Sequence, residues 1–123
     1  MVKIEFGAPF LMGARRYIEY ELRGIAFIEG YEKPISFTFE CHPRFLRLSM
    51  EEYYHAKHLY KFFRELFENV ATHEGLWGER GELHAEWSYS DEKINEILDR
   101  IERAMGLEWK DAFRKIFSVH YKV

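Results

Sequence analysis

One long amphipathic segment constrains the fold of this chain more than any other feature. From Ser49 to Gly75, apolar and aromatic residues recur every three or four positions, which is the spacing of a helix with one buried face. Ser49 and Glu52 have the spacing of a capping box, and Gly75 suits the left-handed turn that ends many helices. We therefore expect a helix over residues 49–75 that packs on another layer of structure. Its apolar face comprises Tyr53, Ala56, Leu59, Tyr60, Phe62, Phe63, Leu66, Phe67 and Val70.

Strand patterns occupy much of the remaining sequence. Apolar residues alternate with polar ones in residues 2–6, 16–29, 35–42 and 82–89, as in strands with one buried face. At Gly24 the second of these runs changes, because apolar residues continue on the face that was polar before it. We therefore expect a bulge or a bend at this glycine.

Two shorter helices are expected after the last strand. Ser90 is a suitable N-cap for a helix that ends at Gly106, and a further apolar pattern of helical spacing contains Trp109. Residues 7–14 and 43–48 are expected to be connections, and the last six residues fit either a helix or a strand. The order is therefore β-β-β-α-β-α-α. It predicts an α+β fold with a small, mainly antiparallel sheet, three N-terminal strands plus one after the long helix, and helices packed on one face.

Composition narrows the class of protein. The 123 residues fit a single domain over residues 1–123, and the net charge of −3 predicts no general attraction to nucleic acid or anionic membranes. There is no apolar run that could span a bilayer and no signal-peptide core at the N-terminus, so we expect a soluble, cytoplasmic protein.

Glutamine is absent while Glu, Lys and Arg are abundant, which favours a thermophilic source. The single cysteine, Cys41, excludes an internal disulfide and is expected in the core.

Aromatic residues are unusually frequent, at 18% of the chain. Such a set either fills a large core or places some rings in a pocket or a subunit interface, where Tyr, Trp and Phe are enriched. We favour the second interpretation, and therefore expect an interaction module that forms a homodimer. Its interface is expected to include Tyr53, Tyr60, Phe67 and Trp77.

Three residues on one border of the predicted helix form the clearest chemical pattern. Glu51, His55 and His58 are spaced so that their side chains converge on one side of a helix. Two imidazoles and a carboxylate are a ligand set for zinc or non-haem iron, and the same groups suit acid–base catalysis. However, His commonly lies at the border of an amphipathic helix without any such role. The alternative function is therefore a small enzyme that depends on a divalent metal or on acid–base chemistry at these three residues.

Two other patterns have a polar-surface interpretation and a functional one. His42 and His84 lie on the outward faces of their strands, and would approach each other with Glu40 and Glu86 if those strands were neighbours. Such a patch is a candidate acid–base site, although an antiparallel sheet commonly leaves one face in water.

Basic residues near aromatic ones give a second alternative, the binding of single-stranded nucleic acid. The pairs Arg15–Arg16 and Arg44 with Arg47 lie close in sequence to Tyr17 and Phe45. The acidic net charge and the absence of an RNP-type motif count against this function. The sequence does not decide whether the protein is an enzyme.

Overall fold

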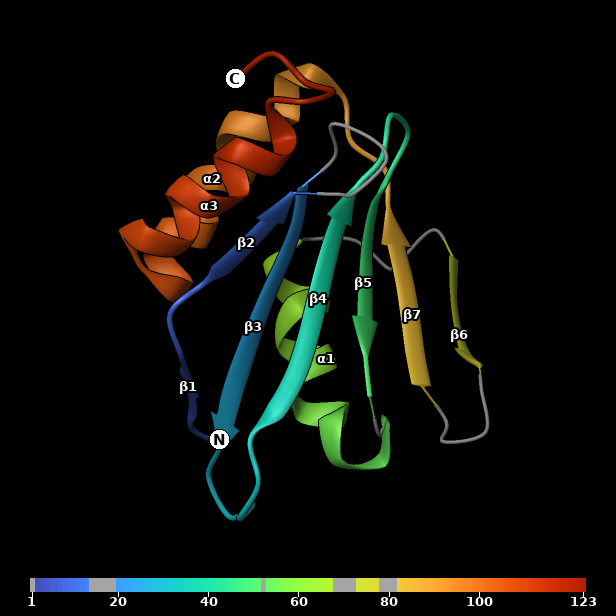
Figure 1. Cartoon of the computed structure of the whole chain (residues 1–123), viewed down its shortest axis with the longest axis vertical. Coiled ribbons are helices and arrows are strands. Elements are labelled where there is room, and N and C mark those ends of the chain that lie inside the picture. The colour runs from blue at the N-terminus through green and yellow to red at the C-terminus, as the bar shows by residue number, and fades with distance from the viewer. Residues whose placement is uncertain (1, 14–19, 52, 68–72, 78–81) are drawn as a thin grey trace.

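In the computed structural model, three helices cover one face of an antiparallel sheet (Figure 1). The structure describes residues 2–13, 20–51, 53–67, 73–77 and 82–123, with only the backbone described for residues 53–55 and 73–77. The strands of this part are β1 (Ile4–Phe6), β2 (Phe10–Gly13), β3 (Tyr20–Ile28), β4 (Ile35–Cys41), β5 (Leu46–Met50), β6 (His73–Trp77) and β7 (Glu82–Trp87). The helices are α1 (Tyr53–Leu66), α2 (Asp91–Met105) and α3 (Leu107–Phe117). The α+β fold is confirmed.

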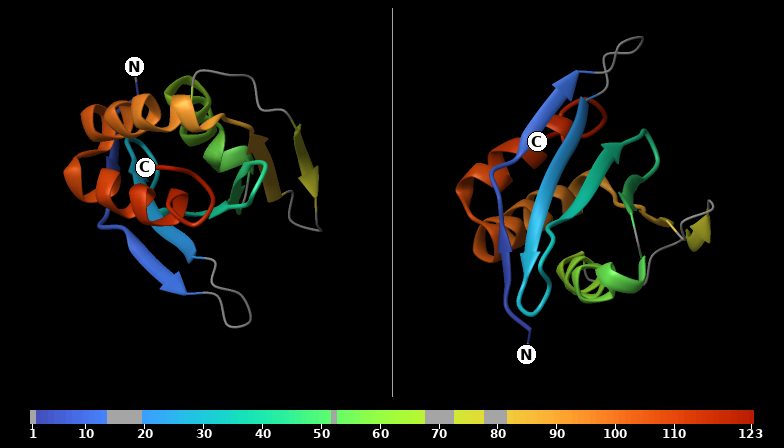
Figure 2. Two further views of the ribbon diagram at one scale, coloured as in Figure 1. Left: turned by 90° about the horizontal axis from the view of Figure 1, so that it is seen from above. Right: turned by 60° about the horizontal axis from the view of Figure 1, so that its bottom comes forward.

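The strand order of the sheet is β1-β3-β4-β5-β7-β6, and β2 pairs with β3 on the same edge as β1. Each pair of neighbouring strands is antiparallel. Helix α1 joins β5 to β6, and β7 then returns to lie between these two strands. Figure 2 shows α1, α2 and α3 on the same side of the sheet. The prediction of helices on one face is therefore confirmed, and we call the opposite side of the sheet the open face.

The sequence pattern missed three strands. β2 lies in one segment that it assigns to a connection, and β5 spans the end of the other connection and the start of the predicted long helix. β6 begins before the predicted end of that helix at Gly75 and continues past it. Ser49 belongs to β5 and does not cap a helix, because α1 begins only at Tyr53. Leu46, Leu48 and Met50 of β5 face the core, so this strand has a clear alternation, but it spans only five residues.

The long helix ends earlier than predicted because residues distant in sequence satisfy its last carbonyl groups. The Arg100 guanidinium of α2 donates to the carbonyl oxygens of Glu65 and Leu66, at 2.9 and 2.8 Å. The hydroxyl of Tyr89 donates to the carbonyl oxygen of Phe67 at 2.8 Å. The final carbonyls of a helix need such partners, and here they do not come from a local glycine cap. The predicted helix end at Gly75 is therefore wrong.

Most of the described aromatic rings lie in the core between the sheet and the helices. Phe63 of α1 is at the centre of the cluster: its ring centroid is 5.0 Å from those of Phe37 and Phe39, and 6.0 Å from that of Phe6. The aromatic excess therefore serves mainly the core, and the preference for a pocket or an interface is wrong for these rings. The largest fully buried aromatic side chains are Trp87, Phe37, Phe39, Phe63, Phe67, Phe113 and Phe117.

Gly24 does not mark a bulge in its pairing with β4, where β3 keeps one register throughout. A Cβ atom at Gly24 would lie 2.4 Å from Cη2 of Trp109 and 2.6 Å from Cζ of Phe37. Glycine is therefore needed here because the Trp109 indole packs directly against the strand.

The bulge lies in the neighbouring edge strand instead. Between β1 and β2, residues 7–9 oppose only two residues of β3, so the register shifts by one. As a result, Phe6 pairs with Ala26 and packs against the core, whereas Phe10 pairs with Arg23 and is 61% exposed on the open face. The bulge thus turns one aromatic side chain outward.

Candidate functional site

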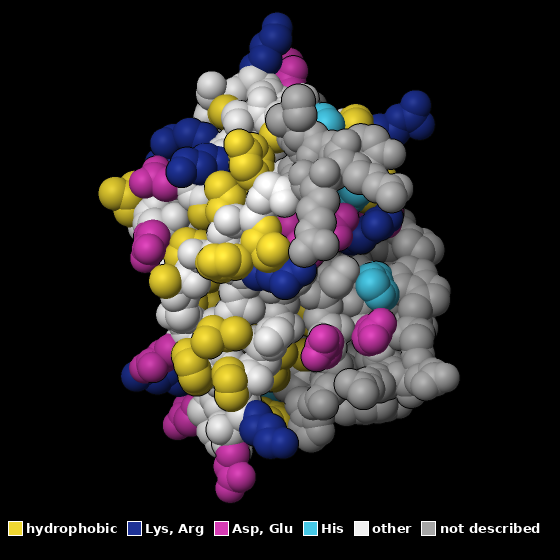
Figure 3. All heavy atoms as spheres, in the orientation of Figure 1, with side chains coloured by type: hydrophobic (Ala, Val, Ile, Leu, Met, Phe, Trp, Pro, Cys, Tyr) yellow, Lys and Arg dark blue, Asp and Glu magenta, His cyan; other side chains and the backbone are white. Residues whose placement is uncertain are grey.

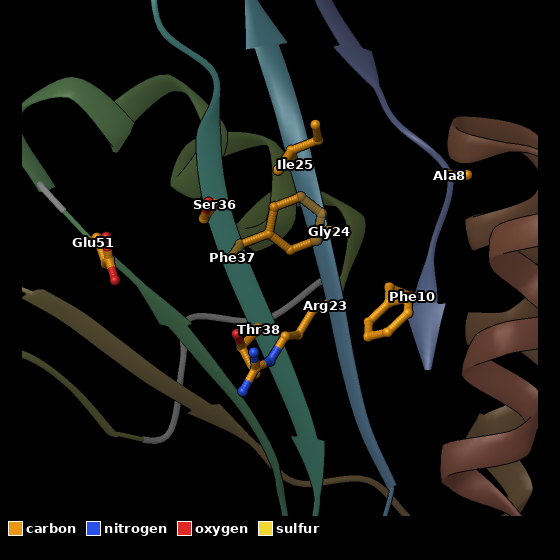
Figure 4. Close-up of a pocket in the computed structure, with 9 residues that line it drawn as sticks. All are labelled: Ala8, Phe10, Arg23, Gly24, Ile25, Ser36, Phe37, Thr38 and Glu51. Carbon is orange, nitrogen blue, oxygen red and sulfur yellow. The ribbon is translucent and has the colours of Figure 1, made fainter. Parts of the chain in front are cut away.

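A hollow in the open face lies over β3, β4 and the end of β5 (Figure 4). Alternate residues of each strand point to this face. Ser36 and Thr38 of β4 have small side chains, while Arg23 and Ile25 of β3 and Glu51, directly after β5, have larger ones. The difference in side-chain size leaves a volume of about 570 Å³. This volume lies within the range of ligand pockets, roughly 300–1,000 Å³.

One side of the hollow is apolar. Phe10 and Ile25 line this side and are 61% and 38% exposed. Phe27, two residues beyond Ile25 on the same face of β3, is 46% exposed, and we call these three side chains the apolar ridge. Figure 3 shows hydrophobic side chains gathered on this part of the face, with acidic side chains and a histidine toward β5 and β7. Large contiguous apolar patches mark interaction surfaces, whereas single exposed apolar residues are normal.

The other side of the hollow is polar and continues into a second cavity of about 220 Å³. Both cavities are bordered by Glu51, and the second reaches Ser49, Glu82 and His84. The Ser49 hydroxyl lies 3.1 Å from Nδ1 of His84, and Nε2 of the same imidazole lies 3.9 Å from a carboxylate oxygen of Glu82. In the neutral tautomer with its proton on Nε2, His84 accepts the Ser49 hydroxyl proton at Nδ1, which is the arrangement of a hydroxyl beside a general base.

Charged side chains of the open face are mostly paired with one another. The pairs are Arg23 with Glu21 at 3.0 Å, His42 with Glu40 at 3.0 Å, and Arg47 with Glu86 at 3.1 Å. Glu51, by contrast, makes no hydrogen bond or ion pair with the described residues, although its side chain borders both cavities. A carboxylate with no partner among the described residues therefore lies between the apolar ridge and the Ser49–His84 pair.

Two of the three predicted metal ligands, Glu51 and His58, line different cavities. Glu51 precedes α1, so the helical spacing that grouped it with His55 and His58 does not apply to it. His58 lies on the covered side of the sheet, in a groove with Ile4, and its ring centroid is 6.4 Å from that of Tyr31. The side chain of His55 lies outside the described part. Among the residues that are described, no group of three His, Cys, Asp or Glu side chains could hold a metal ion.

Two of the four predicted interface residues are buried within the chain. Tyr60 and Phe67 are buried in the core of the chain itself, where a second subunit cannot reach them. The side chains of Tyr53 and Trp77 are not among those described. The exposed apolar ridge was missed, although a signal was present: Ile25 and Phe27 are the apolar residues that follow Gly24 on the formerly polar face.

The two outward-facing histidines do not approach each other, because β5 lies between β4 and β7. The condition for the predicted acid–base patch is therefore not met. His42 pairs with Glu40 and stacks on Phe45 with ring centroids 4.7 Å apart, whereas His84 is paired across the sheet with Ser49. Cys41, next to His42, is 3% exposed, and its predicted place in the core is confirmed.

Two of the candidate nucleic-acid residues, Phe45 and Arg47, engage other protein groups. The Arg47 guanidinium is paired with Glu86 and lies 5.2 Å from the centroid of the Phe45 ring. Arg15 and Arg16 lie outside the described residues, so this function stays a prediction.

Membrane-spanning character and similarity to known proteins give no further evidence about function. In the part of the chain that is described, no helix has both the length and the apolar character needed to cross a membrane. No protein-family model, no curated protein and no solved structure shows a significant match to this chain.

Proposed function

We propose that this protein is an interaction module that acts as a homodimer, and that the open face of its sheet is the dimer interface. The apolar ridge of Phe10, Ile25 and Phe27 is the observation that supports this proposal. Burying one such side chain completely contributes roughly 1.5–3 kcal/mol. A second copy lying on the open face would remove the ridge from water, as helices α1 to α3 do for the other face.

Analytical ultracentrifugation of a Phe10→Ser/Ile25→Ser double variant tests this function. We expect the wild-type chain to sediment as a dimer at tens of micromolar, and the dissociation constant of the double variant to rise by at least about 100-fold. The matched control is Leu107→Ser, since Leu107 is 59% exposed but belongs to α3 on the helical side. A monomeric wild-type chain, or equal dimerisation of the double variant, would contradict the proposal.

A second candidate function is hydrolysis with Ser49 as nucleophile and His84 as base. Its support is the 3.1 Å contact between the Ser49 hydroxyl and Nδ1 of His84, beside an open cavity. A fluorophosphonate probe tests it by mass spectrometry, because attack by Ser49 releases fluoride and leaves the probe on the serine oxygen. We expect labelling of Ser49 that His84→Gln abolishes; an unlabelled wild-type protein would exclude this activity.

Other expectations from the sequence also remain proposals. The scarcity of Gln, Asn and Cys beside abundant Glu, Lys and Arg supports a thermostable protein from a thermophile. A cytoplasmic location also stays a prediction. A thermal unfolding midpoint below about 65 °C, within the range of mesophile domains, would contradict thermophilic origin.

A further inference from the structure

We infer that the two copies are related by a two-fold axis that runs above the open face, parallel to the strands and midway between β3 and β4, so that Ile25 of each copy enters the hollow of the other. This inference rests on the proposed homodimer and assigns its contacts. The ridge strand β3 and the hollow strand β4 are direct neighbours in the sheet. Their register pairs Ile25 with Ser36 and Arg23 with Thr38. Rotation about an axis that lies above and midway between the two strands therefore places β3 of one copy over β4 of the other. Ile25 of one copy then lies opposite Ser36 of the other, and Arg23 lies opposite Thr38.

The shapes of the two strands complement each other in this arrangement. Ile25, with Phe10 beside it on β2, projects from the open face, whereas Ser36 and Thr38 leave the hollow of about 570 Å³. An interface of two-fold symmetry uses the same patch on both copies, so a patch with a protrusion must also contain its own recess. The open face has both side by side (Figure 4).

The charges complement each other as well. Arg23 is on the ridge strand with about half of its side chain exposed (52%), although it pairs with Glu21 of its own chain at 3.0 Å. Glu51 borders the hollow from the far side without an ion pair among the described residues. In the two-fold arrangement, Arg23 of one copy faces the hollow that Glu51 of the other copy borders. Facing sheets lie about 10 Å apart, a gap that an arginine and a glutamate side chain span together. Arg23 therefore pairs with Glu51 of the other copy, twice in each dimer.

A second copy fits this face better than a small cationic ligand does. An amine would meet Glu51 but would leave the apolar ridge exposed. A second copy supplies both a cation for Glu51 and a recess for Ile25, while Arg23, already paired with Glu21 of its own chain, gains a second carboxylate.

Reversing the charges tests the arrangement. In the Arg23→Glu homodimer and in the Glu51→Arg homodimer, each cross-contact joins like charges, so we expect the dissociation constant to rise by at least about 10-fold. An equimolar mixture of the two variants should form a heterodimer as tight as the wild-type dimer, because both of its cross-contacts then join opposite charges. Sedimentation velocity with one variant fluorescently labelled measures this affinity. Arg114→Glu and Glu92→Arg, on the helices, are the matched controls and should dimerise normally.

The outcomes separate the arrangement from the proposed function. A heterodimer no tighter than either variant homodimer, or single variants that dimerise like wild type, would overturn the two-fold arrangement. If Phe10→Ser/Ile25→Ser still abolishes the dimer in that case, the open face remains the interface with a different orientation of the copies. A monomeric wild-type chain would overturn both. Circular dichroism of each variant verifies that it is folded.

Discussion

Gly24 lies beneath the indole of Trp109, and its missing side chain is what allows α3 to pack against β3. We predict that Gly24→Ala lowers the free energy of unfolding by about 1–3 kcal/mol, because the new methyl group would overlap a rigid ring. Gly13→Ala is the matched control, since a Cβ atom there meets no described atom within 4 Å. Its effect should stay within about 0.5 kcal/mol. Urea denaturation measures both, and equal effects of the two substitutions would contradict this account of Gly24.

The same residue shows what sequence can predict at this scale. The alternation of β3 reveals that something changes at Gly24, since a break in a local pattern is visible locally. Its cause is Trp109, which is distant in the chain and packs there only after folding. The position of Glu51 beside the hollow could likewise not be predicted from the sequence. Its carboxylate, unpaired among the described residues, borders the hollow only because β3, β4 and β5 lie side by side.

At the scale of elements, the end of α1 depends on α2. We predict that Arg100→Met lowers the free energy of unfolding by about 1–3 kcal/mol, because two carbonyl groups of α1 lose a charged donor. Arg103→Met on the same helix is the control, since Arg103 makes no side-chain hydrogen bond with the described residues. Chemical denaturation at neutral pH compares the two variants. Equal stability of both would show that the Arg100 contacts do not stabilise the helix end.

The hairpin of α2 and α3 gives a prediction about pH. Lys110 of α3 lies 2.9 Å from Asp99 of α2, and this hydrogen bond, together with the positive charge, lowers the pKa of Asp99. A carboxyl group with a lowered pKa stabilises the folded state above its unfolded pKa of about 3.9, and that contribution is lost as pH falls through the folded value. Asp99→Asn should therefore lose less stability than wild type between neutral pH and the acid range. Parallel acid-denaturation curves for the two proteins would contradict this assignment.

Helices and strands could be predicted from the sequence where residues close in sequence determine them. The alternation in β4 and β7 and the helical spacing in α2 and α3 depend on neighbouring residues, and the sequence locates these elements well. β5 was missed because Ser49 resembles a helix cap, and β6 because the capping partners of α1 come from α2 and Tyr89. β2 was missed because the bulge before it interrupts the alternation.

At the scale of the whole molecule, the fold is asymmetric: three helices bury one face of the sheet, and the other face carries exposed aromatic and aliphatic side chains. The proposed dimer removes this asymmetry, since a second copy covers the open face as the helices cover the other. The homodimer predicted from the sequence is thus retained as a proposal. Its proposed interface is now the apolar ridge instead of the aromatic rings of α1.

Hydroxyl-radical footprinting across a dilution series tests this central claim most directly. We predict that the oxidation of Phe10 and Phe27 slows as the protein concentration rises through the dissociation constant of the dimer. Oxidation of Leu107, exposed on α3, should stay constant over the same series. A dissociation constant of several hundred micromolar corresponds to an association free energy of about 5 kcal/mol. Equal oxidation of Phe10 and Phe27 at every concentration up to that value would contradict the claim that a second copy covers the open face.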